Sequence, residues 1–160
     1  MDKKVIEAIN DQINLELYSA YIYLAYSVAM ERANYRGYSK WLMEHGKEEI
    51  GHGMDFLEFL QKRDESATLQ DVKAENFVET EPLTVAKAIL AHEKKVTESI
   101  YRLHDISKKA GDYATEIFTH GYISEQIEEE DLALTIVDKF TFAGKDTSAK
   151  YSADQELEIM

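Results

Sequence analysis

The chain has 160 residues and a mass of 18.4 kDa, a size that fits one domain with its own hydrophobic core. It contains no cysteine, which excludes disulfide scaffolds, thiol catalysis and iron-sulfur clusters, and its net charge of -13 disfavours binding to nucleic acid and anionic membranes. No apolar signal segment opens the chain, and no apolar run reaches the roughly 18 residues that a membrane span needs. We therefore expect a cytoplasmic protein with one domain over residues 1–160.

The first half of the chain predicts two long helices. One proline and seven glycines interrupt the sequence, and apolar residues recur every three or four positions, which is typical of helices packed on one face. The first helix is predicted from Lys3 to Arg32. Residues 34–37 supply a turn, and a second helix from Tyr38 to Arg63 should run antiparallel to the first because the turn is so short.

Residues 64–81 show no helical period and predict a long connection. A chain of this length reaches about 60 Å when extended, whereas the second helix is only about 40 Å long, so the connection can return to the far end of the bundle. Pro82 suits the first turn of the next helix.

The second half predicts a third helix from Leu83 to Ala110 and a fourth from Tyr113 to Phe142, separated by a glycine stop and an aspartate cap. Gly144 ends the fourth helix. The final segment, Thr147 to Leu157, predicts a short helix that is marginal by itself. We expect a neighbouring subunit to support it.

Polar residues interrupt the apolar stripe of each of the four long helices. Residues three apart on a helix lie on nearly one face. Glu49 with His52, and Gln126 with Glu129, can therefore each hold one site from adjacent turns. A buried carboxylate costs several kcal/mol unless a cation meets it, and oxygen ligands with one imidazole suit iron, manganese or zinc. The pattern predicts a pair of metal ions, with iron preferred, bound inside the bundle by Glu16, Glu49, His52, Glu93, Gln126 and Glu129.

Each interruption also has a simpler interpretation when it is taken alone. A lone Glu16 is more typical of a boundary residue that reaches solvent, and a Glu-x-x-His pair such as Glu49 and His52 is common by chance. Four interruptions on four helices favour the metal site instead. A structural bundle whose core carboxylates pair with lysines is the rival from a different class.

Three further glutamates directly precede proposed ligands and fall on a common flank, where they could hold an additional ion: Glu48, Glu125 and Glu128. In the acidic run 128–130, only Glu130 is expected to be a solvated surface residue. Tyr23 shares the stripe of Glu16 and could hydrogen-bond a ligand or donate an electron, with packing as an equal alternative. His45 is interpreted as a hydrogen-bonded core histidine, with a donor role toward the site as the alternative.

Three sequence segments closely resemble the prokaryotic non-haem ferritins, and the resemblance covers essentially the whole chain: Asn14-Leu15-Glu16-Leu17-Tyr18, Glu48-Glu49-Ile50-Gly51-His52 and Ser124-Glu125-Gln126-Ile127-Glu128-Glu129-Glu130. Ferritin-like di-iron proteins commonly carry a second Glu-x-x-His, and this chain departs from that pattern with Gln126 and Glu129. Ile50 stands where the similar bacterioferritins carry a haem-ligating methionine, so no haem is expected. The absence of cysteine disfavours a rubrerythrin.

The resemblance implies an all-α fold, a ferritin-like four-helix bundle with a long crossover between helices two and three and a short fifth helix. It implies that Glu16, Glu49 and His52 bind one iron, and that Glu49 bridges to a second iron held by Glu93 and Glu129. It places Gln126 beside the pair and gives Tyr23 the position of a family tyrosine. A third iron is implied near Glu48, Glu125, Glu128 and Glu129.

The function implied by this resemblance is iron storage with ferroxidase activity. Fe(II) would be oxidised by O2 or H2O2 at the di-iron centre and deposited as ferric mineral inside a hollow homo-oligomer, expected to contain 24 subunits. The alternative is a di-iron oxygenase or peroxidase of the ferritin-like superfamily that acts on an organic molecule. No nucleic acid or membrane partner is expected.

Overall fold

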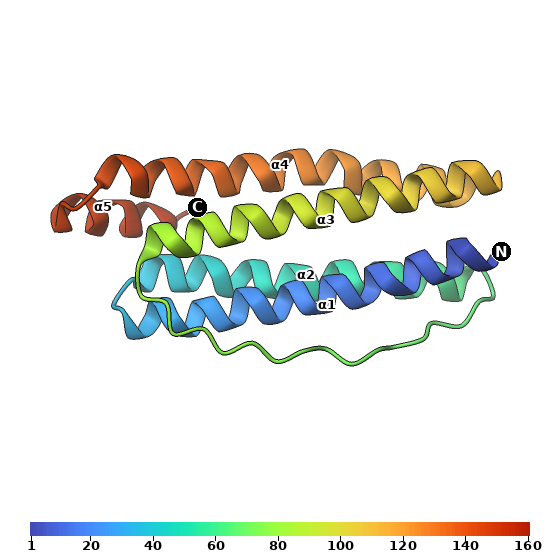
Figure 1. Cartoon of the computed structure of the whole chain (residues 1–160), viewed down its shortest axis with the longest axis horizontal. Helices are drawn as coiled ribbons and strands as arrows, with labels where there is room; N and C mark the ends of the chain where they lie inside the picture. Colours follow the sequence, from blue (N-terminus) through green and yellow to red (C-terminus); the bar gives the residue numbers. More distant parts are fainter.

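The computed structural model describes residues 1–160 and contains five helices and no strand. Figure 1 shows two antiparallel pairs, α1 with α2 and α3 with α4, packed side by side in an up-down-down-up bundle. This confirms the predicted all-α bundle with a short final helix. The helices are α1 (Lys3–Arg32), α2 (Arg36–Lys62), α3 (Pro82–Ala110), α4 (Tyr113–Ala143) and α5 (Thr147–Leu157).

The helix ends follow the local chemistry of the sequence. Three aspartates cap helix N-termini by accepting a hydrogen bond from a backbone N-H in the first turn, and they are Asp2, Asp112 and Asp146. Gly111 ends α3 in the left-handed region, at φ 69°. The predicted bounds differ by one or two residues for α2, α3 and α4, a margin within which helix ends fray.

The crossover between α2 and α3 runs along the outside of α1 without regular structure (Figure 1). Side chains of α1 contact the crossover at several points along its length. Asn10 accepts a hydrogen bond from the backbone N-H of Thr68 at 2.8 Å, and the Tyr26 ring stacks on Phe77 with ring centroids 4.0 Å apart. The predicted long connection is therefore confirmed, and it returns the chain to the end of the bundle where α1 ended.

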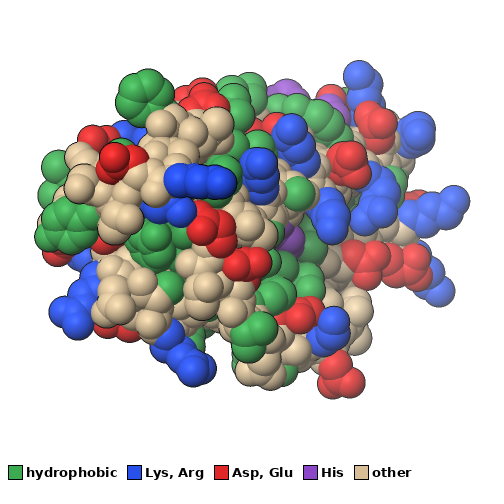
Figure 2. Space-filling model, turned by 60° about the vertical axis from the view of Figure 1, so that its left-hand side comes forward, with side chains coloured by type: hydrophobic (Ala, Val, Ile, Leu, Met, Phe, Trp, Pro, Cys, Tyr) green, Lys and Arg blue, Asp and Glu red, His purple; other side chains and the backbone are tan.

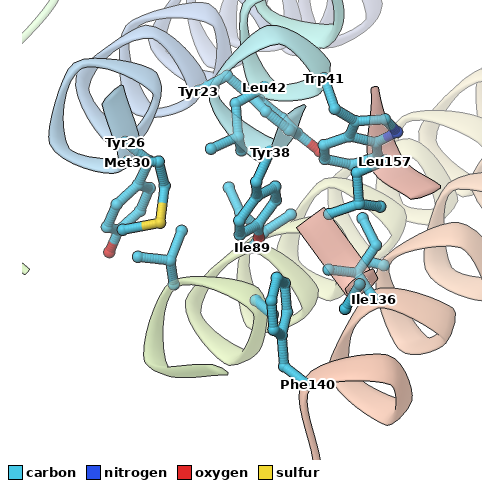
Figure 3. Close-up of a cluster of buried hydrophobic side chains, with 14 of the residues drawn as sticks. Tyr23, Tyr26, Met30, Tyr38, Trp41, Leu42, Ile89, Ile136, Phe140 and Leu157 are labelled. Carbon is cyan, nitrogen blue, oxygen red and sulfur yellow. The ribbon is translucent and has the colours of Figure 1, made fainter. Parts of the chain in front are cut away.

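The hydrophobic core is divided into two clusters. The cluster near α5 contains large aromatic side chains, and Figure 3 shows how side chains from α1, α2, α3, α4 and α5 meet in it, including Tyr23, Tyr38, Trp41, Ile89, Phe140 and Leu157. The second cluster fills the opposite half of the bundle, with Val5, Ile9, Ile13, Phe56, Leu60, Val96, Ile100, Leu103 and Tyr122. Buried polar side chains occupy the region of the core between the two clusters.

Helix α5 packs against its own chain. Ala153 and Leu157 belong to the hydrophobic cluster of Figure 3, and the buried carboxylate of Asp154 accepts hydrogen bonds from the backbone N-H groups of Gly37 and Tyr38 at the start of α2. The chain itself therefore supplies the packing that we expected from a neighbouring subunit. The start of α2 leaves N-H groups unpaired, and Asp154 satisfies two of them.

Several large hydrophobic side chains remain exposed, among them Phe142, which is 94% exposed, and Tyr151. Figure 2 shows hydrophobic side chains lying between acidic and basic ones on the face that includes the α5 end of the bundle. None of the helices combines the length and apolar character needed to cross a bilayer.

Candidate metal centre

Six polar side chains from four helices meet between the two hydrophobic clusters. The carboxylates of Glu16 and Glu93 are 1% and 0% exposed, and the others are also buried except for His52, which is partly exposed. The three-residue spacings in α2 and α4 place both members of each pair on the inward face. The structure therefore brings the six sequence-predicted ligands together, five of them buried and His52 at the edge of the group: Glu16, Glu49, His52, Glu93, Gln126 and Glu129.

Glu16, Glu49 and His52 form a compact group. Each offers one ligand atom within 4.8 Å of the others, and Nδ1 of His52 lies 3.2 Å from Oε2 of Glu49. Oε2 of Glu16 is buried and has no hydrogen-bond partner. A buried anionic oxygen without a donor is costly, so this atom fits a role as a ligand to a cation.

Glu93 faces this group from α3. Tyr23 donates a hydrogen bond to its Oε1 at 2.7 Å, and Nε2 of Gln126 lies 3.3 Å from its Oε2. Gln126 also lies 3.3 Å from Oγ1 of Thr97. The carboxylate is thus held in place by two neutral donors, and neither donor neutralises its charge.

A second flank of the site lies between α2 and α4. Nε2 of His52 lies 3.1 Å from Oε1 of Glu125, and Glu48 offers a ligand atom within 4.8 Å of both. Glu48 also forms a group of the same size with His45 and Glu129. Three of the four residues predicted for a third ion are therefore close together.

Glu128, the fourth predicted residue, lies outside these groups. It is exposed and lines a surface cavity of about 420 Å³ between α3 and α4. Its neighbour Glu130 is only partly exposed and accepts a hydrogen bond of 2.6 Å from Oγ1 of Thr97. The expectation that Glu130 is the solvated residue of the acidic run is wrong, because this side of α4 packs on α3.

The site also contains a glutamine that the sequence analysis missed. Gln12 is fully buried, accepts a hydrogen bond from Oγ of Ser99 at 2.6 Å, and donates one from Nε2 to Oε1 of Glu16 at 2.7 Å. Because the serine can only donate to the amide oxygen, it orients the amide nitrogen toward Glu16. One signal was present in the sequence: Gln12 lies four residues before Glu16, on the same face of α1.

His45 and His92 lie beside the site without joining the six ligands. His45 stacks between Trp41 and Tyr23, with ring centroids 3.7 and 5.8 Å away, and its Nδ1 lies 3.1 Å from the carbonyl oxygen of Trp41. This agrees with the interpretation of His45 as a hydrogen-bonded core histidine. His92 is buried against Oγ of Ser19 at 2.7 Å, and burial lowers its pKa to about 4.

Burial dominates the electrostatics of the carboxylates. Burial raises the pKa of Glu49 and of Glu129 to about 7, and it raises the pKa of Glu16 well above its ordinary value, with a further increase from the nearby Glu49 charge. Burial also raises the pKa of Glu93, although hydrogen bonds from Tyr23 and Gln126 oppose it. Burial therefore favours the protonated form of all four acids, and a cation bound among them would favour the ionised form.

His52 is the one cationic partner within the group. Burial by itself lowers its pKa, but hydrogen bonds with Glu125 and Glu49 raise that pKa to about 11. None of the salt bridges in the chain joins a lysine or arginine to Glu16, Glu93 or Glu129. The rival interpretation, in which core carboxylates pair with lysines, is therefore wrong.

The donor set fits hard or borderline divalent cations. It offers four carboxylates, one imidazole and one amide in a space where several carboxylates cannot all be ionised without compensation. Glu16, Glu49 and His52 could hold one ion, and Glu93 with Glu129 could hold another.

The chain is similar to known proteins over almost its full length. A family model described as the ferritin-like domain matches residues 6–143. The bacterial non-heme ferritin of Staphylococcus epidermidis is 32% identical over 157 residues, which cover 98% of this chain and 95% of that protein. The corresponding protein of Staphylococcus aureus is 31% identical with the same coverage.

Solved structures give the same result for the fold. An open pore ferritin from the hyperthermophilic archaeon Archaeoglobus fulgidus superposes with a TM-score of 0.96 and 35% identity, covering 100% of this chain and 99% of that one. A humanized archaeal ferritin also superposes with a TM-score of 0.96, at 36% identity and with 97% of its chain covered.

Proposed function

The chain belongs to the ferritin-like family, and from this premise we propose that it is an iron storage protein that oxidises Fe(II) at the centre described above. The resemblance to prokaryotic non-haem ferritins that the sequence predicted is confirmed. In this proposal Fe(II) is the substrate, O2 or H2O2 is the oxidant, and the product is stored as a ferric mineral.

One observation carries the proposal. Carboxylates from four different helices converge in a core that offers them no lysine or arginine, and one buried oxygen of Glu16 has no partner at all. Such an arrangement destabilises the protein unless cations enter it, because desolvated like charges repel one another. A site that holds two Fe(II) ions removes this cost.

The side chains have distinct roles in this mechanism. Glu16, Glu49 and His52 bind one Fe(II), while Glu93 and Glu129 bind the other and Glu49 contributes to both. Each Fe(II) loses one electron, so two of them reduce one O2 with two protons to H2O2, or one H2O2 with two protons to water. Oxygen-rich ligands favour the harder Fe(III) product, which lowers the barrier to electron loss.

Protons move at identified atoms when Fe(II) binds. The carboxyl groups of Glu49 and Glu129, with pKa values of about 7, lose their protons to the solvent as the cations arrive. His52 must also lose a proton before a ring nitrogen can bind a metal. Gln126 lies beside Glu93 and is assigned a contact with the oxidant.

A third iron position is proposed on the flank formed by Glu48, Glu125 and Glu129. Glu48 and Glu125 are at least partly exposed, so an ion there would lie between the buried pair and solvent. In this proposal the flank receives iron on its way to or from the buried pair. Glu128 was predicted to take part, and its place outside the groups gives it a peripheral role.

Storage requires a closed assembly, and we propose a homo-oligomeric shell of 24 chains. The exposed hydrophobic side chains, including Phe142 and Tyr151, support burial between subunits. A shell of this size should elute near roughly 440 kDa in gel filtration, since each chain contributes 18.4 kDa. Iron loaded aerobically should elute with it.

The decisive experiment is stopped-flow oxidation of Fe(II) by the native protein and by the variant Glu49→Ala. Loss of the carboxylate shared by both ions should reduce the initial rate by at least about a hundredfold. The matched control is Glu44→Ala, on the same helix, because Glu44 is exposed and pairs only with Lys47. Equal rates for native protein and Glu49→Ala would overturn the proposal.

The alternative function, oxidation of an organic molecule, needs a cavity beside the ligands. Two surface cavities of about 420 and 370 Å³ are lined by none of the six ligands, which supports iron itself as the substrate. Comparison of O2 with H2O2 in the same stopped-flow experiment would identify the preferred oxidant. Failure to retain iron in the assembled particle would favour the alternative.

A further inference from the structure

A second cluster of metal-ligating side chains lies outside the centre described above. It occupies the end of the bundle where α3 turns into α4, and it consists of His104, Glu116 and His120. Each residue offers one ligand atom within 4.8 Å of the other two. Glu116 and His120 are four residues apart on α4, so they lie on adjacent turns of one face and meet His104 from α3.

A buried threonine fixes the ring of His104. Oγ1 of Thr119, which is fully buried, donates its only proton to the carbonyl oxygen of Glu116 at 2.8 Å and lies 3.0 Å from Nδ1 of His104. Because that proton is already used, Nδ1 of His104 must be the donor in the second hydrogen bond. A neutral His104 ring therefore keeps its lone pair on Nε2, the arrangement found in metal-binding histidines.

The other two side chains are not occupied by competing partners. The Glu116 carboxylate takes part in no salt bridge, and the His120 ring contacts that of His104, with centroids 5.2 Å apart and planes at 34°. Two imidazoles at this distance gain little from each other, whereas both can face one cation. Glu116 and His104 are partly buried and His120 is exposed, so an ion can reach the cluster from solvent.

We propose that His104, Glu116 and His120 bind a single divalent transition-metal ion of the zinc class, at a site separate from the carboxylate centre. Two imidazoles and one carboxylate match the ligand set of zinc sites that keep one position open to water. The imidazoles also discriminate against Mg²⁺ and Ca²⁺, which prefer oxygen ligands. His120 precedes Gln126 by six residues, so this cluster lies about 9 Å along α4 from the carboxylate centre. The cluster and the carboxylate centre have no residue in common.

The ion would join α3 to α4 beside their connecting turn. Gly111 and Asp112 form that turn, and the cluster lies within three turns of helix on either side of it. A metal bridge between the helices stabilises the folded chain, because the unfolded chain does not hold the three ligands together.

The test uses crystals of the full assembly soaked in Zn²⁺ and measured on both sides of the zinc absorption edge. An anomalous peak bounded by the His104 ring, the Glu116 carboxylate and the His120 ring is the expected result. In solution, calorimetric titration of the native protein should detect one Zn²⁺ ion per chain at this cluster. The variant His120→Gln should bind that ion at least about tenfold more weakly. This exposed substitution should leave the Fe(II) oxidation rate unchanged, which separates this proposal from the proposed function.

Asp105→Asn is the matched control, since Asp105 is exposed beside His104 but is not part of the cluster. It removes one nearby negative charge and should leave the number of Zn²⁺ ions per chain as in the native protein. The proposal is overturned if the soaked crystals lack a peak at the three residues. It is equally overturned if His120→Gln and Asp105→Asn bind Zn²⁺ alike.

Discussion

The hydroxyl group of Tyr23 donates a hydrogen bond of 2.7 Å to Oε1 of Glu93, joining α1 to α3 in the middle of the bundle. Both side chains are fully buried, so solvent cannot replace this donor if it is removed. The bond favours the ionised form of Glu93, and burial acts in the opposite direction. The phenol therefore adjusts how readily Glu93 accepts a cation.

Replacing Tyr23 by phenylalanine should weaken the binding of Fe(II) without abolishing it. Loss of one hydrogen bond to a charged group costs about 1.5 to 3 kcal/mol, which corresponds to roughly a tenfold or greater loss of affinity for the ion held by Glu93. Anaerobic titration calorimetry at pH 7 measures this affinity for Fe(II). Tyr18→Phe is the control, because Tyr18 donates to Glu75 in the crossover. Indistinguishable affinities for the two variants would show that the bond has no role in binding.

Gln12→Leu should disturb the site although Gln12 binds no ion in this proposal. The amide donates to Oε1 of Glu16 and so orients a carboxylate whose other oxygen, Oε2, is buried and has no hydrogen-bond partner. Loss of a residue that orients a ligand typically lowers metal affinity about 10-fold to 100-fold. Anaerobic Fe(II) titration measures the change, with the exposed substitution Gln61→Leu as control. A Gln12→Leu protein with native affinity would rule out this orienting role.

Binding of Fe(II) should release more protons at pH 6 than at pH 8. Glu49 and Glu129, whose pKa values are about 7, carry most of their protons at pH 6 and few at pH 8, whereas His52 is protonated at both. The difference should approach about two protons per chain, and potentiometric titration under anaerobic conditions measures it. In Glu129→Gln it should fall by about one proton. A release that does not depend on pH would contradict the assigned protonation.

The same pKa shifts predict how pH affects the metal-free protein. The folded pKa of Glu49 and Glu129 lies above the unfolded value of 4.5, so their contribution to stability is complete below that value. It is lost as the pH rises through about 7. The urea midpoint of metal-free protein should therefore decrease over this interval, and Glu129→Gln should reduce the decrease.

Two glycines of α2 should respond in opposite ways to alanine. A Cβ atom at Gly37 would lie 1.9 Å from the backbone oxygen of Asp154, whereas one at Gly51 would meet no atom within 4 Å. Gly37→Ala should destabilise the chain by roughly 3 kcal/mol, because backbone must move, and Gly51→Ala should stabilise it by up to about 1 kcal/mol. Thermal unfolding at one protein concentration measures both. A similar stability for the two variants would contradict the packing of α5 on α2.

Local sequence patterns were sufficient to predict the helices. Spacings of three and four residues, Pro82 at a helix start and Gly111 at a helix end act within one or two turns, so the chain alone specifies them. The inward direction of the candidate ligands was predictable for the same reason, since Glu49 and His52 share a helix face whatever surrounds them. The support of α5 by its own chain was not predicted, because the hydrogen bonds from Gly37 and Tyr38 to Asp154 join residues far apart in the sequence.

The sequence by itself determined that polar side chains would interrupt four apolar helix stripes, and it led us to expect a cation among them. Only the tertiary structure decided which side chains meet across helices: Ser99 holds Gln12 against Glu16, Tyr23 donates to Glu93, and His104 contacts His120. Helical periodicity fixes the direction of a residue relative to its own helix axis. The rotation and the offset of one helix against another depend on the packing of the whole core, and these set every contact between helices.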